Sequence, residues 1–204
     1  MLVATIVALS KSVFLNDRID LSTVNISQLY SDCSLDGKLN FTAFKTAIDR
    51  IEGNKDVKNN SIIVIIDFSL ASTKERFFVI DLENKKLLYH ALVAHGRNTG
   101  ENMAKHFSNT SESKKSSLGL FVTAETYNGK HGYSLKLDGL DKGVNDNARE
   151  RLIVIHGADY VTHKFASQQG RLGRSWGCPA LPPALTKEII NTIKGGYPLF
   201  AYYE

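Results

Sequence analysis

The stretch that most limits what this chain can fold into is SIIVIIDF, residues 61–68. A run of β-branched and aromatic residues of this length is typical of a buried strand. Further short apolar segments follow, several of them separated by turn-forming residues, at 76–81, 86–94, 118–127, 133–137, 151–155 and 197–203. So many short strands predict a mainly β core, a sandwich or barrel, with flanking helices in an α+β chain.

Helical segments are predicted around this core. Residues 22–60 form an N-terminal helical segment, in which Asn40 can cap a helix whose apolar residues recur at helical spacing. Shorter helices are expected at 161–169 and at about 184–194. The chain therefore divides into an arm or signal remnant (1–21), the helical segment (22–60) and a main domain (61–204).

The composition excludes several classes of protein. The chain has 204 residues and a formal net charge of +4, and its basic residues are scattered, so nucleic-acid binding is not expected. Its two cysteines, Cys33 and Cys178, make no disulfide framework or zinc motif, so we expect free thiols, no metal and no cofactor. The apolar start MLVATIVALS is too short to span a bilayer and lacks a positive flank. It is either the remnant of a secretory signal or a short element that docks on the domain, and no integral membrane segment is predicted.

Two motifs carry candidate chemistry: IVIHGAD, around His156, and GRLGRSWGCPAL, around Cys178. The first places a histidine at the end of an apolar strand, and the second places a cysteine in a Gly- and Ser-rich loop. A nearby imidazole or guanidinium favours the thiolate, and a Cys–His pair activates a nucleophile for acyl transfer. The N–H groups of Gly177 and Cys178 are candidates for an oxyanion hole. The structural alternative is an inert buried cysteine and a strand-end histidine with satisfied hydrogen bonds.

These motifs resemble those of a known family. His156-Gly157 followed by Ser175-Trp176-Gly177-Cys178 is similar to the catalytic motif of the L,D-transpeptidase (YkuD-like) family, which has His-Gly or His-Ser and, downstream, Ser/Thr-His-Gly-Cys. SSLGLF resembles the family's upstream strand, in which small residues and a glycine precede an aromatic residue. AHGRNTG, GKHGYSLKLDGL and the two catalytic motifs resemble a divergent branch of murein L,D-transpeptidase catalytic domains, and the resemblance covers roughly residues 25–204. The resemblance implies an L,D-transpeptidase-like β-sandwich or barrel for residues 61–204 and a reaction that needs no metal.

The resemblance also implies roles for individual residues. Cys178 is expected to be the nucleophile, His156 its base, and Gly157 the residue whose carbonyl orients the imidazole. The thiol would attack a stem tetrapeptide of peptidoglycan at its diamino-acid carbonyl, expel D-alanine, and pass the acyl group to the amine of a second stem. Peptidoglycan stem peptides are the expected partners. Because this polymer lies outside the cytoplasmic membrane, a periplasmic or exported location is expected.

The sequence departs from the family pattern beside the cysteine. Trp176 stands where most members have a second histidine, and Pro179-Ala180 follows where an arginine usually lies two residues after the cysteine. The residues expected to contact substrate instead are Arg171, Arg174, Ser175, Trp176 and His95. Arginine can grip a carboxylate with two hydrogen bonds, although Arg174 is equally suited to bonding loop carbonyls. His95 and His131 each precede a glycine, so each can line the cleft or lie in a surface turn.

Three functions stay open at this point. The first is a transpeptidase, the second an L,D-carboxypeptidase or other wall-peptide hydrolase with the same Cys–His pair, and the third a non-catalytic wall-binding protein. The first two differ in cleft shape and water exclusion, which the sequence does not display. The presence of Cys178 and His156 argues against the third, whereas Trp176 favours it. Nothing indicates an oligomeric state, and Cys33 is expected to be a bystander.

Overall fold

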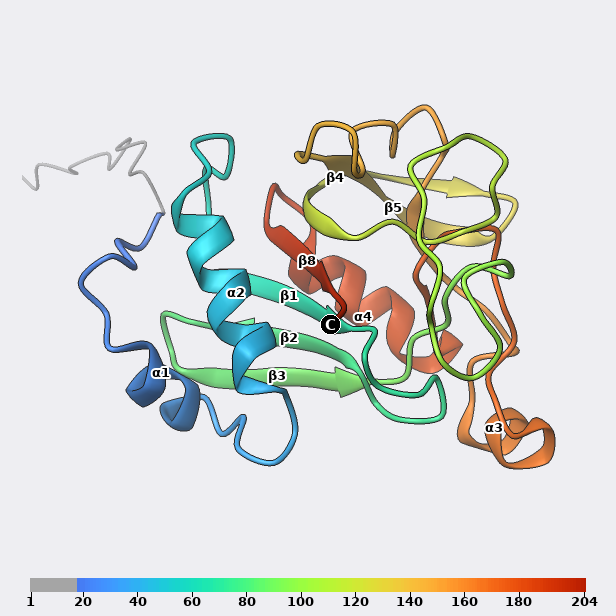
Figure 1. The fold of residues 1–204 in the computed structure, drawn as a ribbon, viewed down its shortest axis with the longest axis horizontal. Helices are drawn as coiled ribbons and strands as arrows, with labels where there is room; N and C mark the ends of the chain where they lie inside the picture. Colours follow the sequence, from blue (N-terminus) through green and yellow to red (C-terminus); the bar gives the residue numbers. More distant parts are fainter. Residues whose placement is uncertain (1–17) are drawn as a thin grey trace, which may run out of the picture.

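The computed structural model describes residues 18–204, whose strands form one eight-stranded sheet (Figure 1). The strand order is β3-β2-β1-β8-β4-β5-β6-β7, with β1–β8 and β6–β7 parallel and the other neighbours antiparallel. The strands are β1 Ile62–Asp67, β2 Phe77–Asp81, β3 Lys86–Ala91, β4 Gly119–Gly129, β5 Gly132–Gly139, β6 Val154–Gly157, β7 Ala180–Leu181 and β8 Pro198–Tyr202. The predicted mainly β core is confirmed.

The two edges of this sheet are joined close to the candidate nucleophile. Beyond the end of β3, Ala94 pairs with Ala180 of β7, and the Ala94 N–H donates to the Ala180 carbonyl at 2.9 Å. The Ser175 N–H likewise donates to the His95 carbonyl at 3.0 Å. The sheet is therefore nearly closed into a barrel, and the loop that carries Cys178 is held at the closure.

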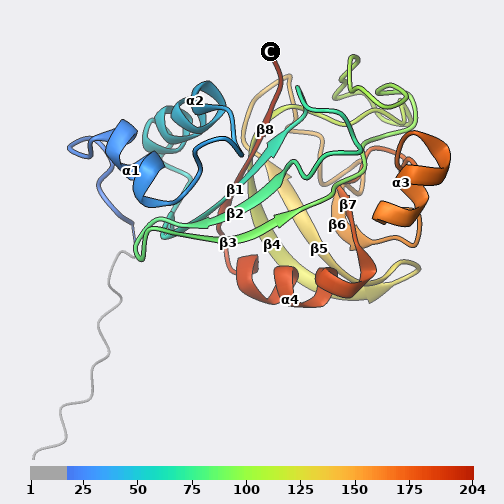
Figure 2. The same cartoon turned by 90° about the horizontal axis from the view of Figure 1, so that it is seen from below.

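Four helices lie in residues 18–204: α1 Ile26–Asp32, α2 Phe41–Glu52, α3 His163–Gln169 and α4 Pro183–Ile193. Figure 2 shows α1 and α2 on one face of the sheet and α4 on the other. The alternation of side chains along β1 explains both layers. Ile63 and Ile65 are buried in the cluster that contains α1 and α2, whereas Val64 and Ile66 are buried in the cluster that contains α4. Asn40 caps α2 as predicted, accepting a hydrogen bond from the Thr42 N–H.

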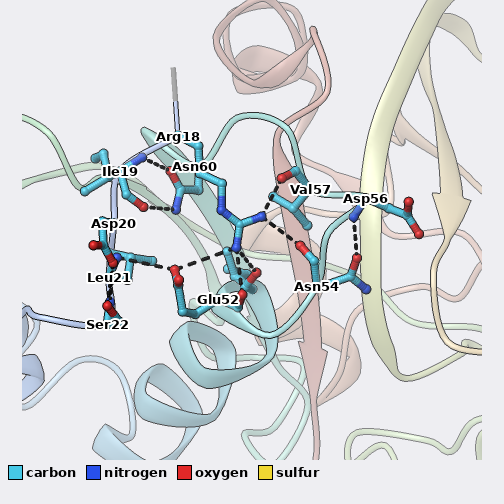
Figure 3. Close-up of polar contacts among 11 residues, drawn as sticks. Arg18, Ile19, Asp20, Leu21, Ser22, Glu52, Asn54, Asp56, Val57 and Asn60 are labelled. Atoms are coloured by element: carbon cyan, nitrogen blue, oxygen red, sulfur yellow. Dashed lines mark hydrogen bonds and ion pairs between the residues drawn. The ribbon is translucent and has the colours of Figure 1, made fainter. Parts of the chain in front are cut away.

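The first described residues fasten the C-terminal end of α2. The Arg18 guanidinium donates hydrogen bonds of 2.7–3.0 Å to the carbonyl oxygens of Ile51, Glu52, Asn54 and Val57 (Figure 3). The last carbonyls of a helix have no partner within the helix, and a cation there also meets the negative end of the helix dipole. This side chain therefore adds to the C-cap at Gly53, whose N–H donates to the Asp49 carbonyl, and joins the helix to the loop that leads into β1.

Replacing Arg18 with glutamine is expected to lower the free energy of unfolding by about 1–3 kcal/mol, because several carbonyls lose a charged donor. Urea unfolding followed by circular dichroism measures the loss. Lys55→Gln, which removes an exposed charge from the same loop, is the matched control and should change little. A loss in the Arg18 variant no larger than in this control would contradict the capping role.

The beginning of β6 differs from the prediction. A strand was expected at 151–155, ending before His156, but the structure places both His156 and Gly157 within β6. The cause is Leu152, whose φ of +55° is in the left-handed region that an extended strand does not contain. The chain therefore turns at Leu152, and β6 starts two residues later.

The interpretation of residues 1–10 as a signal remnant lies outside the described residues. Of the helices in residues 18–204, none is long and apolar enough to cross a bilayer.

Candidate active site

The parallel pairing of β6 with β7 brings the two sequence motifs together. His156 lies opposite Ala180, and Gly157 lies opposite Leu181. Cys178 precedes Ala180 by two residues, so it lies beside the start of β6. Its Sγ is 3.6 Å from the carbonyl oxygen of Leu152, the residue at the turn before that strand. The candidate base and nucleophile therefore come from adjacent segments of one strand pair.

His156 is held in a defined orientation. The residue is 3% exposed, and its Nδ1 lies 2.9 Å from the Gly157 carbonyl oxygen. A carbonyl only accepts, so Nδ1 carries the proton and the neutral ring keeps the lone pair of Nε2. Burial lowers the pKa of His156, and the neighbouring His131 lowers it further. The hydrogen bond to the Gly157 carbonyl raises the pKa and so opposes both effects. The lowered pKa keeps the ring neutral near neutral pH, with Nε2 available as a base.

The Cys178 thiol is partly shielded from solvent. Burial raises its pKa, and this is opposed by the backbone N–H of Val154 and the positive charge of Arg151. Its hydrogen bond within the described chain goes to the Leu152 carbonyl, with none to the His156 ring. The thiol is thus in its protonated resting form, close to groups that stabilise a thiolate.

The loop around the thiol is braced from within. The Gly177 N–H donates to Ser175 Oγ at 3.1 Å, and that hydroxyl donates to the Cys178 carbonyl at 2.6 Å. Ser175 is buried, so both of its bonds serve the turn and not a substrate. The Gly177 N–H is occupied in the same way, which leaves the N–H of Cys178 as the remaining candidate of the two for an oxyanion donor.

Arg171 and Arg174, which were expected to contact substrate, both form ion pairs with Glu101. Arg174 Nη1 lies 2.6 Å from a carboxylate oxygen of Glu101, and Arg171 Nε lies 3.0 Å from the other. Arg174 also donates to the carbonyl oxygens of Arg97 and Gly100 at 3.4 Å. The alternative that Arg174 stabilises loops is the one that the geometry favours, and we do not include either arginine in the proposed site.

His95 is buried in the fold. It is 1% exposed, with Nδ1 2.7 Å from Arg76 Nη2 and Nε2 3.2 Å from the Gly100 carbonyl oxygen. The guanidinium only donates and the carbonyl only accepts, so the ring is neutral with its proton on Nε2. Neither ring nitrogen is free for a substrate, and we do not include His95 in the proposed site either.

His95 makes stability depend on pH. Burial and the Arg76 charge lower its pKa from 6.5 to about 4. Because the folded pKa is the lower one, His95 contributes stability that is present above pH 6.5 and is lost as the pH falls towards 4. The expected loss is about 2–3 kcal/mol. Urea unfolding at pH 7 and pH 4.5 measures it, and His95→Gln, which titrates no proton, should show a smaller loss. An equal loss in both proteins would contradict this assignment.

Arg151 is the residue near the thiol that the sequence did not reveal. Its guanidinium donates at 2.7 Å to the carbonyl oxygens of Ser108 and Lys115, and none of the ion pairs within residues 18–204 includes it. A Cβ at Gly177, whose φ is +131°, would lie 3.4 Å from Arg151 Nη2. Arg151 therefore fastens the segment 108–117 next to Gly177, and its charge forms no ion pair within residues 18–204.

Two hollows flank this arrangement. One, of about 470 Å³, is lined by Arg151, Leu152, Lys114 and Trp176, and the ammonium of Lys114 lies 4.9 Å from the centre of the Trp176 ring. Trp176 is 74% exposed there, so its ring can meet a substrate. The other, of about 560 Å³, is lined by His156 together with residues of the β4–β5 hairpin, α4 and the segment after β6, among them His131, Tyr133, Tyr160 and Lys187. Within the described chain no three His, Cys, Asp or Glu side chains cluster as metal ligands.

Comparison with known proteins gives one family. The family model of the L,D-transpeptidase catalytic domain matches residues 35–202. No curated protein matched the sequence. Among solved structures, an L,D-transpeptidase from Mycobacterium smegmatis is similar at 12% identity and a TM-score of 0.44, covering 71% of this chain and 60% of its own.

Two further structures are similar. The helical cell shape determining protein Pgp2 from Campylobacter jejuni has 14% identity and a TM-score of 0.46, with 78% of this chain and 55% of its own covered. An L,D-transpeptidase (residues 123–326) from Xylanimonas cellulosilytica has 14% identity and a TM-score of 0.40, with 85% and 77% covered. The chain thus spans little more than half of the length of the Mycobacterium and Campylobacter proteins.

Proposed function

Since this chain belongs to the L,D-transpeptidase catalytic domain family, we propose that it transfers acyl groups between peptidoglycan stem peptides through a thioester on Cys178. The observation that supports the proposal is the pairing of β6 and β7, which brings a neutral, oriented His156 next to the segment that contains Cys178. Cys178 is partly exposed, whereas the other cysteine, Cys33, is buried. A substrate outside the cytoplasmic membrane would require the protein to be periplasmic or exported.

The reaction begins with movement of a proton. Sγ leaves the Leu152 carbonyl, and His156 Nε2 accepts the thiol proton as Sγ attacks the diamino-acid carbonyl of a tetrapeptide stem. The Gly157 carbonyl stabilises the imidazolium that forms, because Nδ1 already donates to it. The imidazolium then protonates the nitrogen of the departing D-alanine as the C–N bond breaks. An amine of a second stem attacks the thioester, gives its proton to His156, and releases Cys178.

The environment of the thiol supports this sequence of steps. The charge of Arg151 and the Val154 N–H favour the thiolate, against the burial that disfavours it. The N–H of Cys178 is the proposed donor to the oxyanion. Trp176 and Leu152, both largely exposed, are the two apolar side chains of the hollow that Arg151 also lines, and we place part of the substrate there.

The test uses a disaccharide tetrapeptide, the purified protein and its Cys178→Ala variant, with products followed by mass spectrometry. We expect a crosslinked dimer and free D-alanine from the wild type and neither from the variant. Tripeptide and D-alanine alone would assign an L,D-carboxypeptidase with the same Cys–His pair. No product and no acyl adduct on Cys178 would contradict an enzymatic function and favour a wall-binding protein.

Replacing Arg151 with methionine is expected to slow alkylation of Cys178 by iodoacetamide about tenfold near neutral pH. The variant removes the charge that holds down the pKa of the thiol, so the thiolate fraction falls. The pH dependence of the alkylation rate measures that pKa directly. Arg151→Lys keeps the charge and should lie between the two proteins. An unchanged alkylation profile in the methionine variant would remove Arg151 from the proposed site.

A further inference from the structure

A second imidazole lies against the candidate base. His131 lies between β4 and β5, at the tip of their hairpin, 25 residues before His156. The two ring centroids are 4.5 Å apart and the ring planes are inclined by 27°, which is a stacked arrangement. Both rings line the same hollow, but His131 is exposed to solvent whereas His156 is 3% exposed.

Stacking at this distance has two physical consequences for His156. The first is steric, since the His131 ring covers one face of the imidazole and restricts its rotation away from the Gly157 carbonyl. The second is electrostatic, because two imidazolium charges this close repel one another. Positive charge on the His131 ring therefore disfavours an imidazolium at His156.

The other groups that face His156 do not supply this combination. They are Tyr133 on β5, Asp159 and Tyr160 after β6, Lys187 on α4, and Cys178 before β7. The Asp159 carboxylate favours an imidazolium and the Lys187 ammonium opposes it, so the charges of these two residues act in opposite directions. No stacked ring pair formed by His156 with another aromatic residue occurs in residues 18–204.

We propose that His131 is a positioning residue that acts through His156: its stacked ring holds the base against the Gly157 carbonyl and, as a second basic group on that face, opposes a second proton on the base. The inference rests on the proposed function for its purpose, since it matters only if His156 serves as a base. The inference also bears on Trp176, which stands where most members of the family have a second histidine. The second imidazole, absent from the loop of the nucleophile, comes from the β4–β5 hairpin instead.

The test measures His156 itself, so it is independent of any activity on peptidoglycan. The Cε1–H resonance of His156, assigned by its loss in His156→Asn, is followed through a pH titration by NMR. His131→Phe keeps a stacked ring and removes the basic nitrogens, and it is expected to raise the pKa of His156 by about half a unit or more. His131→Ala removes the stacked ring as well as the basic nitrogens, and it should raise the pKa of His156 further, because the His156 imidazole becomes better solvated.

His163→Phe is the matched control. His163 is an exposed histidine on α3, its side chain is 74% exposed, and it faces Glu75 instead of the site. It should leave the titration of His156 unchanged. A pKa of His156 in His131→Phe equal to that of the wild type would overturn the proposal, whether or not turnover changed. A raised pKa together with a protein that makes no peptidoglycan product would support the coupling of the rings and reject the proposed function alone.

Discussion

Arg76→Met is expected to lower the free energy of unfolding by about 3–5 kcal/mol. Arg76 is 0% exposed although it is charged, and its guanidinium donates to the carbonyl oxygens of Leu70 and Val93 and to the ring of His95. Methionine fills similar space with no donor, so these buried acceptors lose their partner. Each such loss costs about 1–3 kcal/mol.

The opposing effect is that the variant no longer buries a guanidinium. Arg76 is fully buried, so its charge is poorly solvated; this burial lowers the pKa of Arg76 to about 9, and the nearby Asp67 carboxylate opposes the shift. Asp67 is also 0% exposed, and its Oδ2 has no hydrogen-bond partner within the described chain. Removing Arg76 alone therefore leaves a buried anion without its cation, and this cost outweighs the relief.

Urea unfolding measures the loss, with Arg97→Met, at an exposed arginine, as the control. The double variant Arg76→Met/Asp67→Asn should recover part of the stability, because the unbalanced carboxylate is gone. A loss below about 1 kcal/mol in the single variant would show that Arg76 is not the balancing charge.

The elements whose signals are local in sequence could be predicted. The run at 61–68 is β1, and its alternate residues pack against helices on opposite faces, because period-two alternation is intrinsic to a strand. Asn40 caps α2 because a side-chain oxygen at that position reaches the next N–H groups. The apolar segments after residue 76 likewise match strands, with ends that shift by a few residues.

The surroundings of Cys178 could not be predicted in the same way. Arg174 is four residues from Cys178 in sequence, yet it binds Glu101, 73 residues away. Arg151 is 27 residues away and contributes charge to the thiol. The surroundings of Cys178 are determined by the pairing of β6 with β7 and by the turn at Leu152. The sequence indicates neither feature, because only a few apolar residues mark these segments. His131 approaches His156 for a similar reason, since the length of the β4–β5 hairpin determines how far its tip reaches.

His156→Asn is expected to reduce release of D-alanine from a tetrapeptide substrate about a thousandfold. Asparagine can still donate from its side-chain amide to the Gly157 carbonyl, as Nδ1 does now, but it has no group that takes the proton of Cys178. The thiol stays protonated, and the leaving nitrogen receives no proton. The loss therefore reports the base and not the shape of the pocket.

The rate of D-alanine release and the alkylation rate of Cys178 should be measured together. Alkylation is expected to fall less than D-alanine release, because Arg151 still favours the thiolate whereas proton delivery to the leaving group is lost entirely. His163→Asn removes an exposed histidine elsewhere and should leave both rates unchanged. If His156→Asn kept more than about a tenth of the wild-type release rate, another group would have to be the base. Tyr160 is excluded, because burial raises its pKa to about 12 and the phenol therefore stays protonated near neutral pH. The other groups in the hollow that can accept a proton are His131 and Asp159, and the variants His131→Phe and Asp159→Asn in the His156→Asn background would show which of them is the base.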